Sequence, residues 1–315
     1  MNFRTQIPIQ KQQHNQVDYH SKVLLLGSCF VENIGDKLSY YKFQTLQNPF
    51  GILFHPLAIE ALITDAINDK EFTEDDIFLH NELWHYFGAH SKLSSPSKEA
   101  LLQKLSQQIT ATKEWLNSAT HIVITLGTAW VYRYIETDII VANCHKIPQK
   151  QFQKELLSVD AVIESLQAIL VLLKEYNPKT QVIFTVSPVR HLKDGFVENT
   201  QSKAHLISAI HQVINKEQSH YFPSYEIMMD ELRDYRFYVK DMLHPNETAI
   251  DYIWERFQNI WIADEALLTM KTITEIQKGL QHKPFNSKSE AHQVFLKKLE
   301  LKKRAILEAF PHIIF

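Results

Sequence analysis

Two short segments carry the residue types needed for nucleophilic catalysis. Ser28 follows an apolar run at residues 23–27, and Asp241 precedes His244 by three positions. A serine becomes a nucleophile when a histidine accepts its proton, and a carboxylate bonded to the other ring nitrogen fixes the tautomer of that histidine. Because Pro245 disfavours the helical conformation at His244, we expect a loop in which Asp241 reaches the Nδ1 atom of His244. These residues predict a Ser28–His244–Asp241 triad for acyl transfer.

Each of these residues also has a simpler interpretation. Serine is favoured at helix N-termini, so Ser28 is also a candidate N-cap. An acidic capping residue beside a surface histidine would give the spacing of Asp241 and His244, and 16 histidines make such a pair unsurprising by chance. Cys29 is a rival nucleophile, because a thiol near a helix N-terminus has a lowered pKa. If Ser28 points into a cleft, however, Cys29 would point away from it.

The elements that would position these residues alternate between buried strands and long helices. Short apolar runs predict strands at residues 23–27, 121–126, 182–186 and 225–229. Helical periodicity predicts helices at residues 30–38, 56–68, 101–115, 159–176 and 204–215, with Asn246 capping a last one. This alternation predicts an α/β fold, a three-layer α/β/α sandwich around a mostly parallel sheet. Ser28 would lie at the carboxyl end of the first strand, where such sheets bind ligands.

The sequence changes character near residue 262. Beyond it lies a Lys-, Glu- and Leu-rich helical sequence with a basic run at residues 297–304. We therefore predict a core domain at residues 1–261 and a helical C-terminal extension at residues 262–315, packed on the domain or on a partner.

Composition bounds the function classes. A net charge of −3 gives no broad attraction for nucleic acid, and no run reaches the roughly 18 apolar residues that span a bilayer. The polar N-terminal 22 residues do not resemble a secretory signal, and two cysteines do not make a disulfide framework. We expect a cytoplasmic protein with no nucleic-acid partner and no membrane span. The oligomeric state stays open.

Several motifs resemble one known family. The segment GSCFV at residues 27–31 closely matches the motif that names the GSCFA-domain family. Further segments similar to that family are NPFG at 48–51, LGTAW at 126–130, NCHK at 143–146, SPVRH at 187–191 and DMLHP at 241–245. The family resembles the SGNH (GDSL-like) hydrolases, which implies an SGNH/flavodoxin-like sandwich and a serine triad made of Ser28, Asp241 and His244.

The resemblance also implies an oxyanion hole. SGNH enzymes take donors from the serine N–H, from a glycine in the second motif and from an asparagine in a Gly-x-Asn third motif. Ser28 and Gly51 would supply the first two, but Ala129 stands at the asparagine position. A lost donor typically costs about 10²–10³ in rate, so we expect a replacement or poor activity. The candidate replacements are Thr128, Asn48 and Asn143.

Polar loops supply candidate substrate-binding residues. Asn143 and His145 follow a predicted hairpin at residues 131–141; the loop either reaches into the site or is a turn with a buried thiol at Cys144. His145 and Cys144 alone make a poor metal site, so we predict neither a metal nor another cofactor. Arg190 and His191 follow the third strand, and Arg190 suits either a substrate anion or a structural salt bridge. Asn48 completes the predicted substrate-binding set.

Together these features predict a serine-dependent esterase or acyltransferase acting on an O-acylated small molecule or carbohydrate; the carbohydrate preference rests on the resemblance. The alternative is a non-catalytic ligand-binding module that retains the SGNH-like fold. The observation that favours it is Ala129 at the position of the expected asparagine. A third hypothesis is a scaffold that acts through the C-terminal extension.

Overall fold

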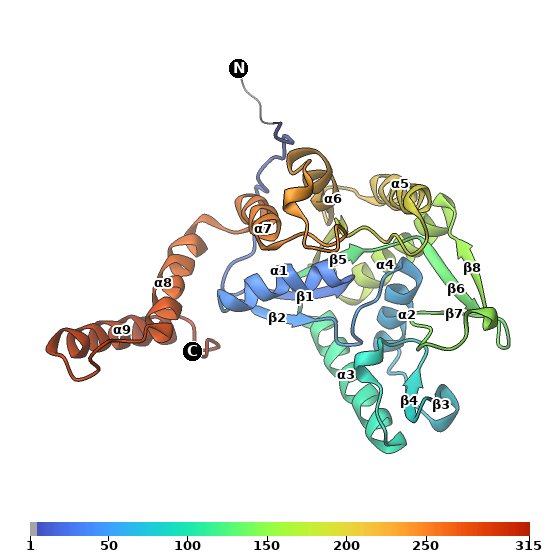
Figure 1. Ribbon diagram of the computed structural model, residues 1–315, viewed down its shortest axis with the longest axis horizontal. Helices are drawn as coiled ribbons and strands as arrows, with labels where there is room; N and C mark the ends of the chain where they lie inside the picture. The colour runs from blue at the N-terminus through green and yellow to red at the C-terminus, as the bar shows by residue number, and fades with distance from the viewer. Residues whose placement is uncertain (1–4) are drawn as a thin grey trace.

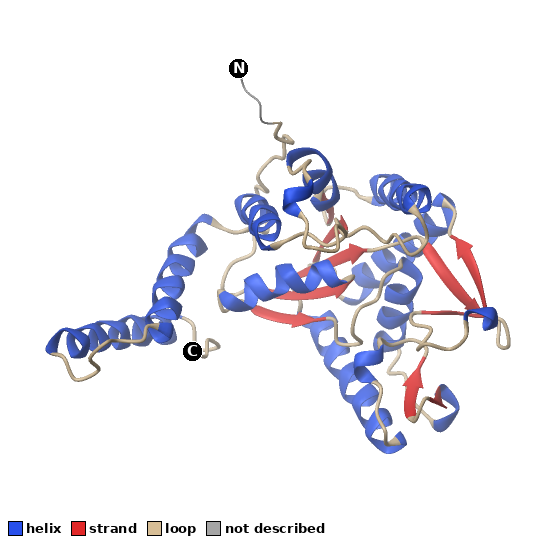
Figure 2. Cartoon of the chain, in the orientation of Figure 1, coloured by secondary structure: helices blue, strands red, loops and turns tan. Residues whose placement is uncertain are grey.

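The predicted apolar runs form the centre of a parallel sheet. The computed structural model describes residues 5–315, so the first four residues of the domain expected at 1–261 lie outside it. Five parallel strands are ordered β10-β9-β5-β1-β2 (Figures 1 and 2). Their bounds are β1 Lys22–Gly27, β2 Gln44–Gln47, β5 His121–Leu126, β9 Gln181–Val186 and β10 Ser219–Phe222. Three of the four predicted strands are therefore confirmed.

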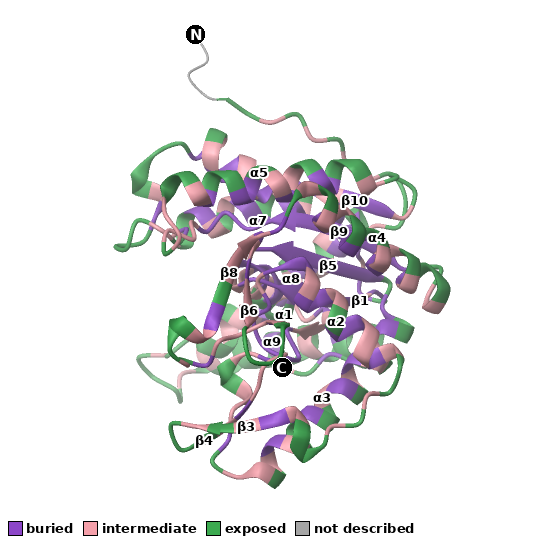
Figure 3. Cartoon of the chain, turned by 90° about the vertical axis from the view of Figure 1, so that its right-hand side faces the viewer, coloured by how far each residue is buried: buried purple, intermediate pink, exposed green. Residues whose placement is uncertain are grey.

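Alternate residues of these strands enter two hydrophobic cores, which makes three layers. Leu25 packs in one core with the helices α1 (Cys29–Tyr40) and α7 (Glu247–Trp261). Leu24 packs in the other core with four helices: α2 (Pro56–Ile67), α3 (Lys98–Ser118), α4 (Val159–Tyr176) and α5 (Phe196–Val213). Figure 3 shows the central strands buried between these layers. The predicted α/β/α sandwich is confirmed.

The strand expected at residues 225–229 is wrong. These residues belong to a short helix, α6 (Ser224–Glu226), and to the π-helical turn Ile227–Glu231 that follows it. Ile227 and Met228 are fully buried there, so the apolar run reflects burial in the core rather than a strand. The strand that pairs with β9 at this edge of the sheet is instead β10, whose sequence SHYF lacks a continuous apolar run.

The predicted helices are confirmed, but α5 begins at Phe196, eight residues before the expected start. Residues 196–203 carry no apolar stripe because three of their polar side chains are buried against loops at the edge of the sheet: Asn199, Ser202 and Lys203. This extra length of helix contributes to the site described below.

Two small antiparallel units flank the sheet. The predicted hairpin is confirmed as β6 (Trp130–Tyr134) and β7 (Ile139–Val141), and β8 (Phe152–Leu156) pairs with the other edge of β6. A second hairpin comprises β3 (Ile77–His80) and β4 (Leu83–Tyr86).

The C-terminal extension forms two helices, α8 (Asp264–Gln281) and α9 (Glu290–Ala309), which project from one side of the sheet (Figure 1). The extension nevertheless joins the core that contains α1 and α7, through Met270 and Ile273 of α8 and through Ile313 after α9. The ring of Phe310 lies 4.9 Å from that of Tyr19. Within the described residues, no helix combines the length and apolar character that crossing a bilayer demands.

Candidate active site

Ser28 lies in a tight turn between β1 and α1. Gly27 has φ of 131°, and a Cβ at this position would lie 2.1 Å from the carbonyl oxygen of Thr125, so only glycine fits. Ser28 holds the N-cap position of α1, but its side chain makes no capping hydrogen bond. The Ser28 Oγ is fully buried and has no hydrogen-bond partner among residues 5–315. An unpaired buried hydroxyl is costly, which argues against a purely structural serine.

Asp241 and His244 form the expected pair. The Nδ1 atom of His244 donates to Oδ2 of Asp241 at 2.7 Å. Met242 has φ of 61°, which curls the loop so that the backbone N–H groups of Leu243 and His244 also donate to Asp241. These three bonds, the backbone ones first, lower the pKa of Asp241 to about 2. The carboxylate therefore stays ionised, and Nε2 of His244 is left to accept a proton. Both side chains are partly exposed.

Backbone contacts hold the His244 loop against the loop that follows β9. The N–H of Arg190 donates to the carbonyl of Leu243 at 3.2 Å. The Arg190 guanidinium lies over the rings of Tyr238 and Tyr235, at 4.5 and 5.3 Å from their centroids. Arg190 thereby lines a separate cavity of about 440 Å³ with these two tyrosines.

The hydroxyl of Ser28 and the ring of His244 are not hydrogen-bonded in this structure, since the Ser28 Oγ has no partner among the described residues. The structure does place the two loops at the same carboxyl edge of the sheet: Ser28 follows β1, and the loop bonded to Leu243 follows β9.

The backbone N–H groups of the candidate oxyanion residues already have acceptors. The pairs, each with its N···O distance, are Ser28 to Thr125 (2.9 Å), Gly51 to Asn48 (2.7 Å), Thr128 to Phe54 (3.0 Å) and Asn143 to Phe87 (3.3 Å). The Asn48 side chain accepts the N–H of Gly27 at 2.9 Å, so it braces the turn that carries Ser28. An oxyanion at Ser28 would have to draw one of these N–H groups away from its present acceptor.

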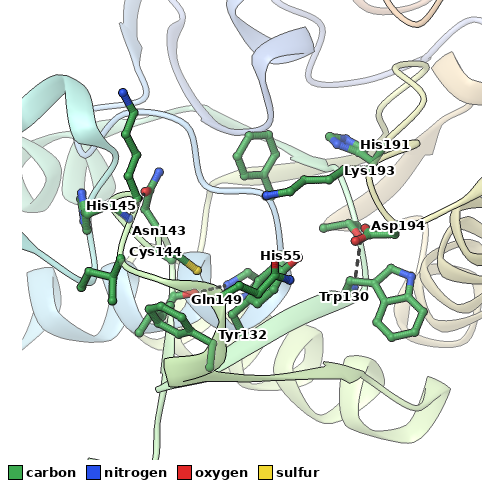
Figure 4. A pocket seen from close by; sticks show the side chains of 17 residues that line it. His55, Trp130, Tyr132, Asn143, Cys144, His145, Gln149, His191, Lys193 and Asp194 are labelled. Atoms are coloured by element: carbon green, nitrogen blue, oxygen red, sulfur yellow. Dashed lines mark hydrogen bonds between the residues drawn. The ribbon is translucent and has the colours of Figure 1, made fainter. Parts of the chain in front are cut away.

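A cavity of about 420 Å³ lies beside the third motif (Figure 4). Four candidate residues line it: Thr128, Asn143, His145 and His191. Aromatic side chains from β6 and from the loop before α2 complete much of the wall, namely Trp130, Tyr132 and Phe54. Among the described residues, Ser28, Asp241 and His244 are not part of this lining.

His145 is held rigidly in this wall. Its Nε2 atom bonds the carbonyl of Tyr86 at 2.8 Å and its Nδ1 atom lies 3.1 Å from Oγ of Ser91. Burial lowers the pKa of His145 to about 4, so the ring is neutral. A substrate contact through either nitrogen would break an existing bond. Burial also raises the pKa of Cys144 to about 11, which makes it a poor thiolate.

His191 is the histidine that offers a free nitrogen to the cavity wall. Its Nε2 atom is buried without a partner among residues 5–315, and a Cβ on Gly127 would lie 3.2 Å from it. Burial is the main cause that lowers the pKa of His191 to about 3, with Lys203 and His244 adding to it. A neutral ring with a free nitrogen is suited to a hydrogen bond with substrate.

The rival nucleophile Cys29 is disfavoured. Burial, the main cause, and the nearby Glu32 raise the pKa of the Cys29 thiol, which outweighs the lowering by the helix N–H groups and by Lys203. Among the described residues, no group of three His, Cys, Asp or Glu side chains could hold a metal ion.

The N-terminal turns of α5 hold the loops around the site, and the sequence did not point to them. Ser202 Oγ accepts the N–H of Ala129 at 2.7 Å, and Asn199 accepts the N–H of His191 at 2.9 Å. Lys203 Nζ donates to the carbonyls of Gly127 and Ser187. The signal was available in the spacing 199, 202, 203, which places three polar residues on one face of a helix.

Individual known proteins match the chain only at low sequence identity. A search of curated proteins gives no match. Among solved structures, an acetyl esterase mutant crystallised with an acetate ion aligns with 80% of this chain and 99% of its own length, at 10% identity and a TM-score of 0.36. A carbohydrate esterase of family 3 from Talaromyces cellulolyticus covers 81% and 99%, at 9% identity and a TM-score of 0.35.

Two family models match the sequence. That of the GSCFA family matches residues 22–257, and that of the C-terminal domain of GSCFA domain proteins matches residues 273–315. With its glycine–serine turn at the end of β1 and its bonded Asp241–His244 pair, the chain belongs to the GSCFA family.

Proposed function

We propose that this protein is a serine-dependent esterase or acyltransferase that acts on an O-acylated small molecule or carbohydrate. The observation that carries the proposal is the 2.7 Å hydrogen bond between His244 Nδ1 and Asp241. It leaves the other ring nitrogen as a base, in a loop bonded to the same sheet edge that presents Ser28.

In the proposed reaction, the Ser28 Oγ attacks the ester carbonyl while Nε2 of His244 takes the hydroxyl proton. Asp241 stabilises the resulting imidazolium. The C–O bond of the tetrahedral intermediate then breaks, and His244 returns its proton to the leaving alcohol. Water or a second hydroxyl group releases the acyl group from Ser28 by the reverse sequence. The Ser28–His244 hydrogen bond forms in the complex with substrate, as such bonds often tighten only there.

The 420 Å³ cavity supports a carbohydrate as the group that carries the ester. Trp130 and Tyr132 offer apolar ring faces, and Asn143, Gln149 and Asp194 line the same space with hydrogen-bonding groups. Sugars present both apolar C–H faces and hydroxyl groups, so they match such a wall. A smaller acylated molecule would fill only part of it.

A non-catalytic binding module is the second candidate function. The observation that favours it is the engagement of the candidate backbone donors with carbonyl oxygens, together with Ala129 at the position of the expected asparagine. Such a module would bind an acylated ligand at the cavity without turnover.

Covalent labelling by a fluorophosphonate separates the two. We expect one adduct, located on Ser28 by peptide mapping, that is absent from Ser28→Ala and His244→Ala. Cys29→Ala is the matched control in the same turn and should label like the wild type. Hydrolysis of acetylated sugars would then be measured on the same four proteins. A folded wild-type protein that stays unlabelled while it binds an acetylated sugar would favour the binding module.

A further inference from the structure

Lys203 carries a buried amino group that the proposed reaction does not yet use. Its side chain is 1% exposed, and its Nζ donates to the carbonyl of Gly127 at 2.7 Å and to that of Ser187 at 2.8 Å. Both acceptors are uncharged groups just beyond the carboxyl ends of β5 and β9. Placing an ammonium group there is costly, and nothing about a helix on a sheet edge requires it. A protein that retains such a group at its candidate site is expected to use the charge.

The turn that carries Ser28 lies within the electrostatic reach of this charge. The carbonyl of Gly127, which accepts from Lys203 Nζ, lies two residues after that of Thr125, which accepts the N–H of Ser28. Lys203 also partly offsets the burial and the Glu32 charge that raise the pKa of Cys29, the residue directly after Ser28. On α6, the centroid of the Tyr225 ring lies 5.7 Å from Nζ of Lys203. The buried charge therefore sits among the ends of β5 and β9, the start of α1 and the loop after β9.

We propose that Lys203 is a positioning residue of the serine site: its ammonium fixes the carboxyl ends of β5 and β9 and holds a positive charge against the Ser28 turn, where negative charge develops in the reaction. The inference rests on the proposed function. It supplies a charge near the third motif, where Ala129 offers no side-chain donor to an oxyanion. A fixed charge in a site that excludes water is worth more than the same charge in water.

The charge has a distinctive pH dependence. Burial lowers the pKa of Lys203 to about 7. The groups that face it do not titrate there: burial raises the pKa of Cys29 and of Tyr225, and His191 has a pKa of about 3. Because His244 is the proposed base for the same step, the effect of the charge is isolated by comparison with Lys203→Arg, which stays charged. Relative to that variant, the rate at which a fluorophosphonate labels Ser28 should fall as the pH rises through about 7 and Lys203 loses its proton.

Three variants test the proposal, with labelling rates measured per folded molecule from pH 5.5 to 9. Lys203→Met keeps an unbranched side chain without charge, and its rate should fall at least about tenfold at pH 6.5, less than the 10²–10³ typical of a direct donor. It should also lack the alkaline fall. Lys203→Arg keeps the charge throughout, so its rate should not decline above pH 7. Ser202→Ala, which loosens the same loop without removing charge, should retain the wild-type alkaline fall.

Two outcomes would overturn the proposal. In the first, the labelling rate of Lys203→Met stays within twofold of the wild-type rate and depends on pH in the same way. In the second, the labelling rates of Ser202→Ala and Lys203→Met depend on pH in the same way as each other. If Lys203→Met does not fold, the Lys203→Arg profile decides. If the wild type is not labelled at all, the proposed function fails, and alkylation of Cys29 by iodoacetamide decides about the charge. Because Cys29 has a raised pKa and Lys203 is neutral above about pH 7, the informative variant is Lys203→Arg, which stays charged where Cys29 titrates. Its pH midpoint of alkylation should lie below that of the wild type; an unchanged midpoint in Lys203→Arg would show that a charge at this position does not act on this turn.

Discussion

At the scale of single residues, the candidate site combines a buried hydroxyl that has no hydrogen-bond partner among the described residues with a histidine whose orientation is already fixed. The Ser28 Oγ is buried without a partner among the described residues, whereas Asp241 is bonded three times over by its own loop. The contrast is chemically sensible, because a nucleophile must keep its lone pairs available while its base must keep one tautomer. Asp241, which has several hydrogen bonds, is thus the residue that orients His244, and Ser28, whose hydroxyl has none, is the residue proposed to react.

Asp241→Asn should test this division of roles. An amide in place of the carboxylate favours the wrong tautomer of His244, so the rate of Ser28 labelling should fall by about 10³–10⁴ with the fold intact. Asp234→Asn is the matched control, since Asp234 also accepts hydrogen bonds in an exposed loop but bonds Arg236 instead. Labelling of Asp241→Asn within tenfold of the wild type would remove Asp241 from the proposed triad.

At the scale of elements, what could be predicted depended on which surface each element faces. The strand at 121–126 is buried on both faces by apolar side chains, so its sequence alone identifies it. The strand β10 and the first two turns of α5 face polar loops or carry polar residues, and their sequences lack the expected periodicity. The Asp241–His244 pair was predictable because three residues of one loop, Asp241, His244 and Pro245, determine it. The acceptor of the Ser28 N–H was not, because the pairing of β1 with β5 brings the carbonyl of Thr125 opposite it. The acceptor of the Gly51 N–H is local, since Asn48 and Gly51 are the ends of one four-residue turn.

The first turns of α5 should therefore matter more than their composition indicates. Asn199→Ala leaves the partly buried N–H of His191 without its acceptor, which should lower the free energy of unfolding by about 1–3 kcal/mol. Gln201→Ala, two residues away on the exposed face, should change it by less than about 0.5 kcal/mol. Urea unfolding measures both. Equal effects would mean that the polar face of α5 does not anchor the loop after β9.

At the scale of the whole molecule, two cores on opposite faces of one sheet carry the fold, and the C-terminal extension belongs to one of them. α8 and the residues after α9 pack on the side of the sheet that holds α1, which is the helix Ser28 precedes. The extension is therefore linked to the site through a shared core, although its outer helix projects away from the body (Figure 1).

Neighbouring isoleucines at the C-terminus test this packing. Ile313 is 3% exposed and Ile314 is 81% exposed. Ile313→Ala should lower the free energy of unfolding by about 2–4 kcal/mol, because it removes buried methyl groups and leaves a cavity. Ile314→Ala should leave it almost unchanged. Chemical denaturation of the full-length variants is the measurement, and indistinguishable values would show that the C-terminal residues are not docked in solution.

Acid should destabilise the fold already at pH values above those at which its carboxylates take up protons. Burial lowers the pKa of His55 and His145 to about 4 and that of His191 to about 3. The unfolded chain binds protons at these histidines from about pH 6.5 downward, whereas the folded chain does not. The contribution of the three neutral rings to the free energy of unfolding is therefore fully present above that pH and is lost as the pH falls toward 4.

Unfolding free energies measured in urea at pH 7 and pH 4.5 should therefore differ by several kcal/mol. His145→Gln removes one of the buried rings and should reduce this difference, whereas His14→Gln at an exposed position should not. A fold as stable at pH 4.5 as at pH 7 would contradict the expectation.

The turn at Gly27 also has a consequence for the order in which the molecule can assemble. Gly27 and Thr125 are register partners across β1 and β5, so the surface against which this turn closes belongs to a strand synthesised much later. At about 5–20 residues per second, a ribosome needs roughly 5–20 s to pass from one to the other. The α5 side chains and the His244 loop emerge later still. A nascent chain therefore spends most of its synthesis without the turn that surrounds Ser28, and the proposed nucleophile reaches its final environment only when nearly the whole sandwich can close around it.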